Sequence, residues 1–270
     1  MKIEFTKMHG CGNDYVYING FAQKISQDKK RDFVIKASDR HFGIGSDGVI
    51  FINPSDKADF EMEMYNADGS RSEMCGNGIR CVAKYVYDHG MTDKCDIAIE
   101  SFGKVKPIHI TAKDGRAKMI RVDMGEPVFD PELINSPILV DGKEYHMTCV
   151  SMGNPHAVMF IDPNGLDIES IGPRFEYHEA FPNRTNAEFV RVDDRNNVHM
   201  RVWERGTGET LACGTGCCAT AVACVLNGYT DRAVTVHVLG GDILIEWDEK
   251  DNHVYMTGPA ATVFDGEIEL

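Results

Sequence analysis

Hydrophobic and polar residues alternate along much of this chain in short runs, which is the pattern of half-buried β-strands. In the first half, the runs occupy residues 2–7, 14–19, 49–52, 59–65, 97–101, 105–111 and 117–123. In the second half, they occupy residues 144–151, 157–161, 186–192, 198–204, 233–239, 242–247 and 252–257. The pattern predicts a fold made mostly of strands.

Apolar residues spaced as on one face of a helix occur in four places. The first is 28–40, where Asp28 is the candidate N-cap. The second begins after Cys75 and ends near Gly90, and the fourth is 217–226. The third, 167–178, is weak and is expected to be broken at Gly172-Pro173. The sequence therefore predicts two strong helices that follow cysteines, and two helices elsewhere.

The two halves of the chain repeat the same order of features. Gly12-Asn13 matches Gly153-Asn154 at an offset of 141 residues, and Cys75-Gly-x-Gly matches Cys213-Gly-x-Gly at an offset of 138. A polar residue that ends a strand stands nine residues before each cysteine: Asn66 in one half, Glu204 in the other. Each half is expected to be a strand-rich layer with a central helix that begins at a cysteine. Duplication of this kind predicts equivalent sites that face each other across a cleft.

Composition excludes several classes of function. The 270 residues carry a formal net charge of −14 and no basic run, which disfavours binding to nucleic acid or an anionic membrane. There is no signal-peptide pattern and no apolar stretch long enough to span a bilayer, so we expect a cytoplasmic protein. Nine cysteines without zinc-site spacing suggest neither a metal site nor a disulfide framework.

Both cysteines stand where a glycine-rich turn enters a helix, a setting that lowers a thiol pKa. If both helices begin in one cleft, the N–H groups of Gly76, Asn77, Gly214 and Thr215 could bind one carboxylate. One thiolate could then remove a proton from one face of the neighbouring carbon, while the opposite thiol returns a proton to the other face. This chemistry is racemisation or epimerisation without a cofactor.

The residues alone leave other interpretations open. Cys75 or Cys213 could act singly with His156 as a base, in a hydrolase or acyl transferase. The two cysteines could also form a redox pair, although redox dithiols usually stand close in sequence. Two glycine-rich stretches, 43–48 and 214–219, resemble dinucleotide-binding loops, but the strands and helices around them are in the wrong order or lack the required acidic residue.

Four motifs in order give the chain a resemblance to the diaminopimelate epimerase family. They are KMHGCGND at 7–14, NADGSRSEMCGNGIRC at 66–81, SMGNPH at 151–156 and ERGTGETLACGTG at 204–216. The resemblance extends from Phe5 to Gly266. It implies an α/β (α+β) fold of two pseudo-symmetric domains, each a mixed, mostly antiparallel sheet wrapped round a central helix, with the active site in the cleft between them. It also implies interconversion of LL- and meso-2,6-diaminopimelate, for lysine and peptidoglycan synthesis, without a cofactor.

The resemblance also assigns roles to positions that match the family's motifs. Cys75 and Cys213 match its catalytic cysteines. His156 and Glu204 match residues thought to adjust the thiol pKa values. The residues matching its substrate-binding positions are Asn13, Asn66, Gly76, Asn77, Asn154, Asn186, Glu204, Arg205, Gly214 and Thr215.

The resemblance further implies two domains, at 1–123 completed by 259–270 and at 124–258, and a homodimer. The expected partner is a small-molecule substrate. The chain departs from the family in two places. Gly48 stands where some members carry a substrate-contacting Gln, which leaves fine specificity open. Phe264 stands where many members carry Tyr near the dimer contact, so a ring is kept and a hydroxyl is lost.

Overall fold

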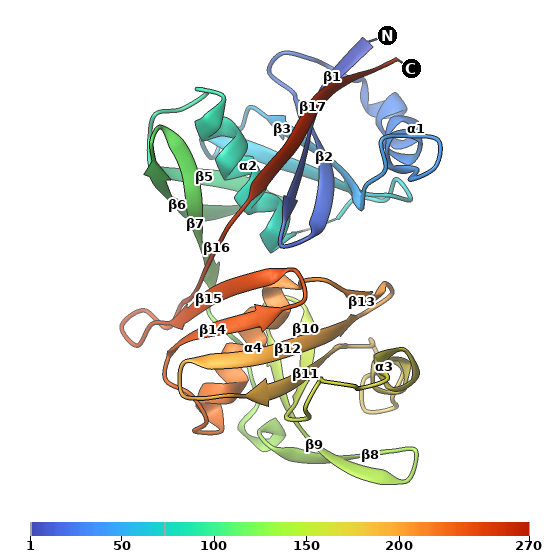
Figure 1. The fold of residues 1–270 in the computed structure, drawn as a ribbon, viewed down its shortest axis with the longest axis vertical. Coiled ribbons are helices and arrows are strands. Elements are labelled where there is room, and N and C mark those ends of the chain that lie inside the picture. The colour runs from blue at the N-terminus through green and yellow to red at the C-terminus, as the bar shows by residue number, and fades with distance from the viewer. Residues whose placement is uncertain (1, 73, 270) are drawn as a thin grey trace. The chain divides into compact units, whose positions relative to one another are not determined.

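The chain divides into two compact units, shown in the computed structural model of Figure 1. The structure describes residues 2–72 and 74–269, so Glu73 of the first cysteine motif lies outside the described residues. Unit 1 is Met1–Val122 together with Gly258–Leu270, and unit 2 is Asp123–Thr257. Unit 2 is thus inserted, in sequence, between two segments of unit 1.

Unit 1 is a sheet with two helices. The strands are β1 (Lys2–Gly10), β2 (Asn13–Asn19), β3 (Gly48–Asn53), β4 (Phe60–Asn66), β5 (Asp96–Ser101), β6 (Lys104–Lys113), β7 (Arg116–Gly125, which continues into unit 2) and β17 (Ala261–Glu269). The helices are α1 (Gln27–Ser38) and α2 (Gly76–Asp88). Helix α2 packs on β1, β2, β5 and β6, whereas α1 packs on β3 and β4.

Unit 2 repeats this plan. The strands are β8 (Ser136–Val140), β9 (Lys143–Ser151), β10 (Pro155–Met159), β11 (Asn186–Val192), β12 (Asn197–Glu204), β13 (Gly208–Thr210), β14 (Ala233–Val238), β15 (Gly241–Trp247) and β16 (Val254–Gly258). The helices are η1 (Pro131–Leu133), α3 (Ile168–Glu176) and α4 (Gly214–Leu226). Helix α4 packs on β9, β10, β11, β12, β14 and β15, and α3 packs on β11, β12 and β13.

Strand pairing confirms the internal repeat. In unit 1, β1–β2 is antiparallel, β2–β3 parallel, β3–β4 antiparallel, β4–β5 parallel, and β5–β6 and β6–β7 antiparallel. In unit 2, β9–β10, β10–β11, β11–β12, β12–β14, β14–β15 and β15–β16 follow the same order of senses. The expectation of two pseudo-symmetric halves, each a mixed and mostly antiparallel sheet around a central helix, is confirmed.

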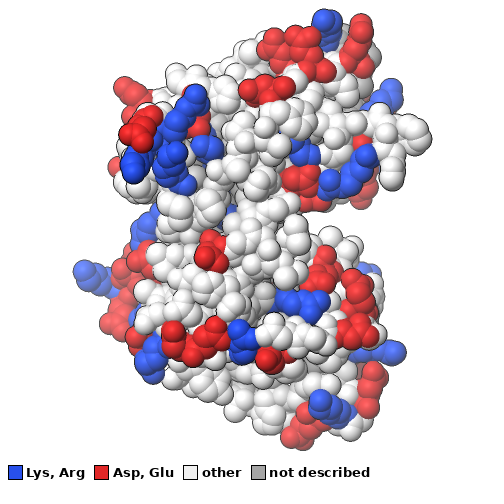
Figure 2. All heavy atoms as spheres, in the orientation of Figure 1, with Lys and Arg blue, Asp and Glu red and all other residues white. Residues whose placement is uncertain are grey.

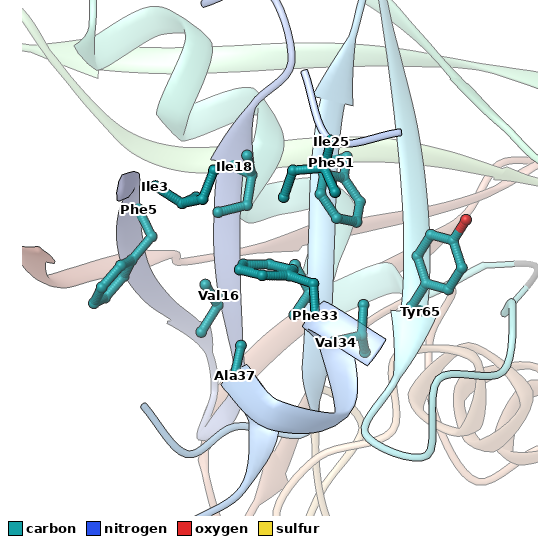
Figure 3. Packing of buried hydrophobic residues seen from close by; sticks show 11 residues of the cluster. Ile3, Phe5, Val16, Ile18, Ile25, Phe33, Val34, Ala37, Phe51 and Tyr65 are labelled. Carbon is teal, nitrogen blue, oxygen red and sulfur yellow. The ribbon is translucent and has the colours of Figure 1, made fainter. Parts of the chain in front are cut away.

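Side chains on successive residues of the central strands pack on opposite helices, because strand side chains alternate between the two faces of a sheet. In unit 1, Val16 and Phe51 pack on the α1 face with Phe33 of the helix (Figure 3). Their neighbour Tyr17 lies on the other face, where its hydroxyl reaches the carbonyl of Gly78 in α2. The central strands are therefore buried on both faces.

Several sequence predictions were wrong or incomplete. The chain forms β8, β13 and β17, none of which was predicted. Helix α3 runs without a break and contains Pro173. Ser26 occupies the N-cap position of helix α1, without a capping hydrogen bond from its side chain, so Asp28 lies in the first turn instead of at the N-cap.

Acidic and basic side chains are interspersed on the face shown in Figure 2, where neither sign covers a continuous area. In the residues that the structure describes, no helix is long and apolar enough to cross a membrane.

Candidate active site

Both cysteines occupy the N-cap position of the central helix in their unit. The Cys75 sulfur accepts a hydrogen bond from the N–H of Gly78, at 3.3 Å, at the start of α2. The Cys213 sulfur accepts one from the N–H of Gly216, at 3.4 Å, at the start of α4. Each sulfur therefore lies at the positive end of a helix dipole, beside the N–H groups that open the helix.

In unit 1, Cys75 lies beside Asn13 at the start of β2. The thiol donates to Oδ1 of Asn13 at 3.2 Å, and Nδ2 of Asn13 donates to Asp47 at 2.7 Å. Arg40 donates to Asp47 at 2.9 Å and to Asp14 at 2.7 Å. The carboxylate of Asp47 thus orients the Asn13 amide with its oxygen toward the sulfur, a role that the sequence did not suggest.

Two further predicted positions lie where β3 meets β4. Asn66 ends β4, and its Nδ2 donates to the hydroxyl of Ser70 at 3.0 Å in the following turn. Gly48 pairs with Asn66 across the strands, and a Cβ at Gly48 would lie 2.0 Å from the carbonyl oxygen of Tyr65. This backbone therefore admits only glycine at position 48.

The guanidinium of Arg80 is fully buried behind the first turn of α2. It donates to the carbonyl of Gly76 at 3.1 Å, to the side chain of Asn77 at 2.8 Å and to the carbonyl of Pro259 at 3.2 Å. These bonds hold the first turn of α2, including both predicted backbone donors of unit 1, against the segment that leads to β17.

In unit 2, Cys213 is buried among acidic groups. Burial raises the pKa of its thiol well above the usual value, and the carboxylates of Glu204 and Glu188 raise it further. Hydrogen bonds involving Thr215 and Gly216 act in the opposite direction without cancelling the rise. The expected lowering of the thiol pKa is therefore wrong for Cys213, because burial and the two carboxylates outweigh the hydrogen bonds to the sulfur.

A continuous set of polar contacts leads away from the Cys213 sulfur. Oγ1 of Thr215 lies 3.5 Å from the sulfur and 3.3 Å from Nδ2 of Asn154. Oδ1 of Asn154 lies 3.1 Å from Nε2 of His156, and Nδ1 of His156 lies 2.6 Å from Oε1 of Glu188. Three predicted residues, Asn154, His156 and Thr215, are thus brought together with the cysteine.

The other predicted residues of unit 2 cluster at the ends of β11 and β12. Nδ2 of Asn186 donates to the carbonyl of Pro155 at 2.7 Å, and its Oδ1 accepts from the N–H of Arg205 at 3.0 Å. Glu204 accepts from the hydroxyl of Thr210. Burial raises the pKa of the Glu204 carboxyl despite that hydrogen bond.

Sequence reasoning missed Glu188, a fully buried carboxylate on β11. The residue stands between apolar Ala187 and Phe189, in a run that was expected to be a strand. An ionisable residue inside such a run was the available signal, since Glu is rarely buried without a partner. Its partner, His156, stands 32 residues earlier in the chain.

Each unit therefore offers one sulfur at a helix N-terminus, with side-chain amides beside it. Within the described residues, no three His, Cys, Asp or Glu side chains are grouped so as to hold a metal ion. The helix N-termini suit a carboxylate, and the sulfurs suit proton transfer at the carbon that carries it.

The chain resembles known proteins along most of its sequence. The family model described as diaminopimelate epimerase matches residues 5–129 and 148–263. The diaminopimelate epimerase of Acetivibrio thermocellus is 55% identical, over 99% of this chain and 99% of the relative. That of Methanococcus maripaludis is 54% identical, over 99% of this chain and 100% of the relative.

Solved structures share the fold at low sequence identity. A phenazine biosynthesis protein of the PhzF family from Bacillus anthracis superposes with a TM-score of 0.74, at 17% identity and full coverage of both chains. A hydroxyproline epimerase from Agrobacterium vitis gives a TM-score of 0.70 at 15% identity, covering 99% of this chain and 91% of its own. With the family match extending over most of the sequence, the chain belongs to the diaminopimelate epimerase family.

Proposed function

We propose that the protein is a diaminopimelate epimerase, which interconverts LL-2,6-diaminopimelate and meso-diaminopimelate by proton transfer at one Cα. The reaction uses no pyridoxal phosphate and serves the synthesis of lysine and peptidoglycan precursors. The proposal rests on family membership, and on one observation of the structure. In each pseudo-symmetric unit the cysteine caps the central helix and accepts a hydrogen bond from the third N–H of that helix.

In the proposed mechanism, the two units are the two domains of one active site, and their cysteines face opposite sides of the substrate Cα. The thiolate of one cysteine takes the Cα proton and becomes a thiol. The electron pair left on Cα is delocalised into the substrate carboxylate, which the two helix N-termini stabilise. The thiol of the other cysteine then gives its proton to the opposite face and becomes a thiolate. Inversion is complete, and the reverse reaction restores the starting protonation.

The substrate's other groups are assigned to the remaining residues. The N–H groups of Gly76, Asn77, Gly214 and Thr215 hold the carboxylate at the reacting carbon. Asn13, Asn66, Asn154 and Asn186 bind polar groups of the substrate, with Glu204 placed for an ammonium group. The guanidinium of Arg205 suits the distal carboxylate, which a monoamino acid lacks. His156 and Glu204 adjust the proton affinities of the catalytic thiols.

Exchange of the Cα proton with solvent tests the reaction. We expect deuterium to enter Cα of LL-diaminopimelate in deuterated water, and no exchange in single amino acids. Cys75→Ala and Cys213→Ala should each reduce epimerisation by at least about 10²-fold, because each removes one of two acid–base groups. Cys95→Ala, which changes a cysteine outside the site, is the control.

Two results would contradict the proposal. Exchange in a different amino acid alone would identify a racemase of another specificity, for which Gly48 is the pertinent departure from the family. Full activity of either catalytic cysteine variant would rule out the two-base mechanism, and would favour a single-cysteine enzyme that uses His156.

We also infer that the protein is a homodimer that associates through β17. Val263 and Phe264 expose about half of their side chains on this strand, although Phe264 also packs edge-on against Phe5. Val263→Arg should convert the dimer to a monomer in sedimentation equilibrium. An unchanged mass for Val263→Arg, or a monomeric wild type, would refute this interface.

A cytoplasmic location follows from the proposed function, since lysine and peptidoglycan precursors are assembled there. It is also supported by the cysteines of the described residues, none of which is joined in a disulfide, as suits a reducing compartment. Cell fractionation should recover the protein with cytoplasmic markers, and recovery in an extracellular or periplasmic fraction would contradict the assignment.

A further inference from the structure

Unit 2 contains a buried pair of titratable side chains, a glutamate and a histidine, behind its cysteine, at positions where unit 1 has an aliphatic residue and a tyrosine. Glu188 and His156 are both fully buried, and Oε1 of Glu188 lies 2.6 Å from Nδ1 of the ring. At the repeat offsets of 138 and 141 residues, the corresponding residues of unit 1 are Ile50 and Tyr15. The pair therefore belongs to one half of the repeat only.

The glycines in the first turns of the two central helices show how close this pair is to the cysteine. A Cβ at Gly216 would lie 2.8 Å from Oε1 of Glu188 and 3.3 Å from the Cys213 sulfur. A Cβ at the equivalent Gly78 would lie 2.8 Å from Cδ1 of Ile50. The carboxylate of Glu188 therefore packs against the first turn of α4, at the position where the methyl group of Ile50 packs against the first turn of α2.

Both ring nitrogens of His156 face oxygen acceptors. Nδ1 faces the Glu188 carboxylate, and Nε2 lies 3.1 Å from Oδ1 of Asn154. With Glu188 ionised, both contacts are hydrogen bonds only when both ring nitrogens carry protons, which is an imidazolium ring paired with a carboxylate. In a site without solvent, that positive charge requires the negative charge of Glu188.

The charged ring in turn determines the orientation of Asn154. With Oδ1 accepting from Nε2 of His156, the amide must present Nδ2 to Oγ1 of Thr215, 3.3 Å away. The Thr215 oxygen then accepts from Asn154, and its own proton is directed to the Cys213 sulfur at 3.5 Å. A neutral ring would accept from Nδ2 instead, and Thr215 would turn its proton away from the sulfur toward Oδ1.

We propose that Glu188 is a positioning residue for the reaction: by keeping His156 doubly protonated, it fixes the amide of Asn154 so that the Thr215 hydroxyl donates to the sulfur of Cys213. Glu188 is buried and touches no substrate, so it acts only through this relay. The assignment rests on the proposed catalytic role of Cys213. Glu204, the other carboxylate near Cys213, accepts from Thr210 and interacts with His156 and Cys213 directly, so it does not act through Asn154 and Thr215.

The protonation of His156 tests the relay without substrate. In ¹⁵N-labelled protein near neutral pH, we expect the chemical shifts of both ring nitrogens to be those of imidazolium. In Glu188→Gln, which keeps the side-chain shape and removes the charge, the shifts should become those of a neutral ring. A neutral ring in the wild type would overturn the proposal whether or not the variant folds, as would a ring unchanged by Glu188→Gln.

Kinetics test the consequence for catalysis. Glu188→Gln should lower kcat by about 10²-fold, the usual scale for a misplaced catalytic group. Glu63→Gln is the matched control, since Glu63 is a buried, ion-paired carboxylate of unit 1 bound by Lys30 and Arg71. Activity of Glu188→Gln equal to that of the wild type, or an equal loss in Glu63→Gln, would overturn the positioning role.

The two tests separate this inference from the proposed function. If the nitrogen shifts follow Glu188 as expected but the protein does not epimerise diaminopimelate, the reaction assignment fails and the His156–Glu188 relay stands. If epimerisation is found and the ring is neutral, the relay fails alone.

Discussion

At the scale of single residues, the two cysteines share a backbone setting and differ in the charges around them. Cys213 is buried beside Glu188 and Glu204, both of which raise its thiol pKa. The first turn of α2, which follows Cys75, is instead held by the buried guanidinium of Arg80. The two units thus share the cysteine at the helix N-terminus but differ in the charged residues near it, which are carboxylates in unit 2 and a guanidinium in unit 1.

Alkylation of Cys213 should report its raised pKa. Because only the thiolate reacts, we expect iodoacetamide labelling of Cys213 in Cys75→Ala to be slow at neutral pH and to rise only well above pH 9. Glu204→Gln removes one of the carboxylates that raise the pKa, so labelling should begin at a lower pH. Mass spectrometry of the cysteine-containing peptides gives the rates.

Cys149 serves as the internal control for that experiment. Burial, with a contribution from Glu188, raises its pKa to about 11, and Glu204 is not among the causes of the shift. Its labelling profile should therefore be the same with and without Glu204→Gln. Rapid labelling of Cys213 at neutral pH would contradict the electrostatic description of unit 2.

The residues of the site were foreseeable from sequence to different degrees. The positions of Cys75 and Cys213 at helix starts followed from the glycine pattern, because glycine-rich turns before an apolar helical stretch are local signals. The direction of the Cys213 pKa shift did not follow, since it depends on burial and on Glu188, whose side chain approaches the cysteine only after α4 packs on β11. Asp47 and Arg80 were missed for the same reason.

At the scale of elements, predictions succeeded where one face of a strand or helix is apolar. They failed at β8, which contains Pro137, and at β17, whose side chains are largely exposed. Strand β17 carries no apolar alternation and is identified only by its partner β1, which is at the other end of the sequence. Such strands are determined by tertiary pairing more than by local pattern.

Helix α3 shows why the expected break at Gly172-Pro173 does not occur. Ile168 and Phe175 are buried on one side of the helix, in the apolar cluster that includes Trp203. A Cβ at Gly172 would lie 2.5 Å from ring atoms of Trp203, so this glycine allows the helix to approach β12 closely. Tertiary packing thus compensates for the hydrogen bond that Pro173 cannot donate.

Substitution of Gly172 should measure that contact. Gly172→Ala places a methyl group against the large, partly buried ring of Trp203, and we expect it to lower the free energy of unfolding by about 1–3 kcal/mol, as overpacking does. Glu169→Ala, at an exposed position of the same helix, should change it by less than about 0.5 kcal/mol. Urea unfolding measures the free energy of unfolding of both variants. Equal losses would show that the contact with Trp203 does not require glycine at position 172.

At the scale of the whole molecule, an ion pair joins the two ends of the segment that forms unit 2. Nδ1 of His253 lies 2.9 Å from both carboxylate oxygens of Asp123, where the segment begins. Hydrogen bonding to Asp123 raises the pKa of His253 above its usual 6.5. The folded protein therefore binds this proton more tightly than the unfolded chain does.

The sign of the resulting pH dependence follows from linkage. The stabilisation is fully present below pH 6.5 and is lost as the pH rises through the higher folded pKa of His253. We expect the stability difference between the wild type and Asp123→Asn to shrink over that window. Thermal midpoints from pH 5 to pH 9 measure it, and a difference that grows with pH would contradict the assignment.

The pairing of β1 with β17 also determines the order in which the chain can fold during its synthesis. Lys2 and Glu267 are 265 residues apart and meet at 3.2 Å, so β1 lacks this neighbour until Glu267 has been translated. All residues of unit 2 leave the ribosome before β17 does. N-terminal domains usually fold first during synthesis, but the inserted unit 2 can complete its sheet before unit 1 does. At that stage one edge of β1 has no strand paired to it.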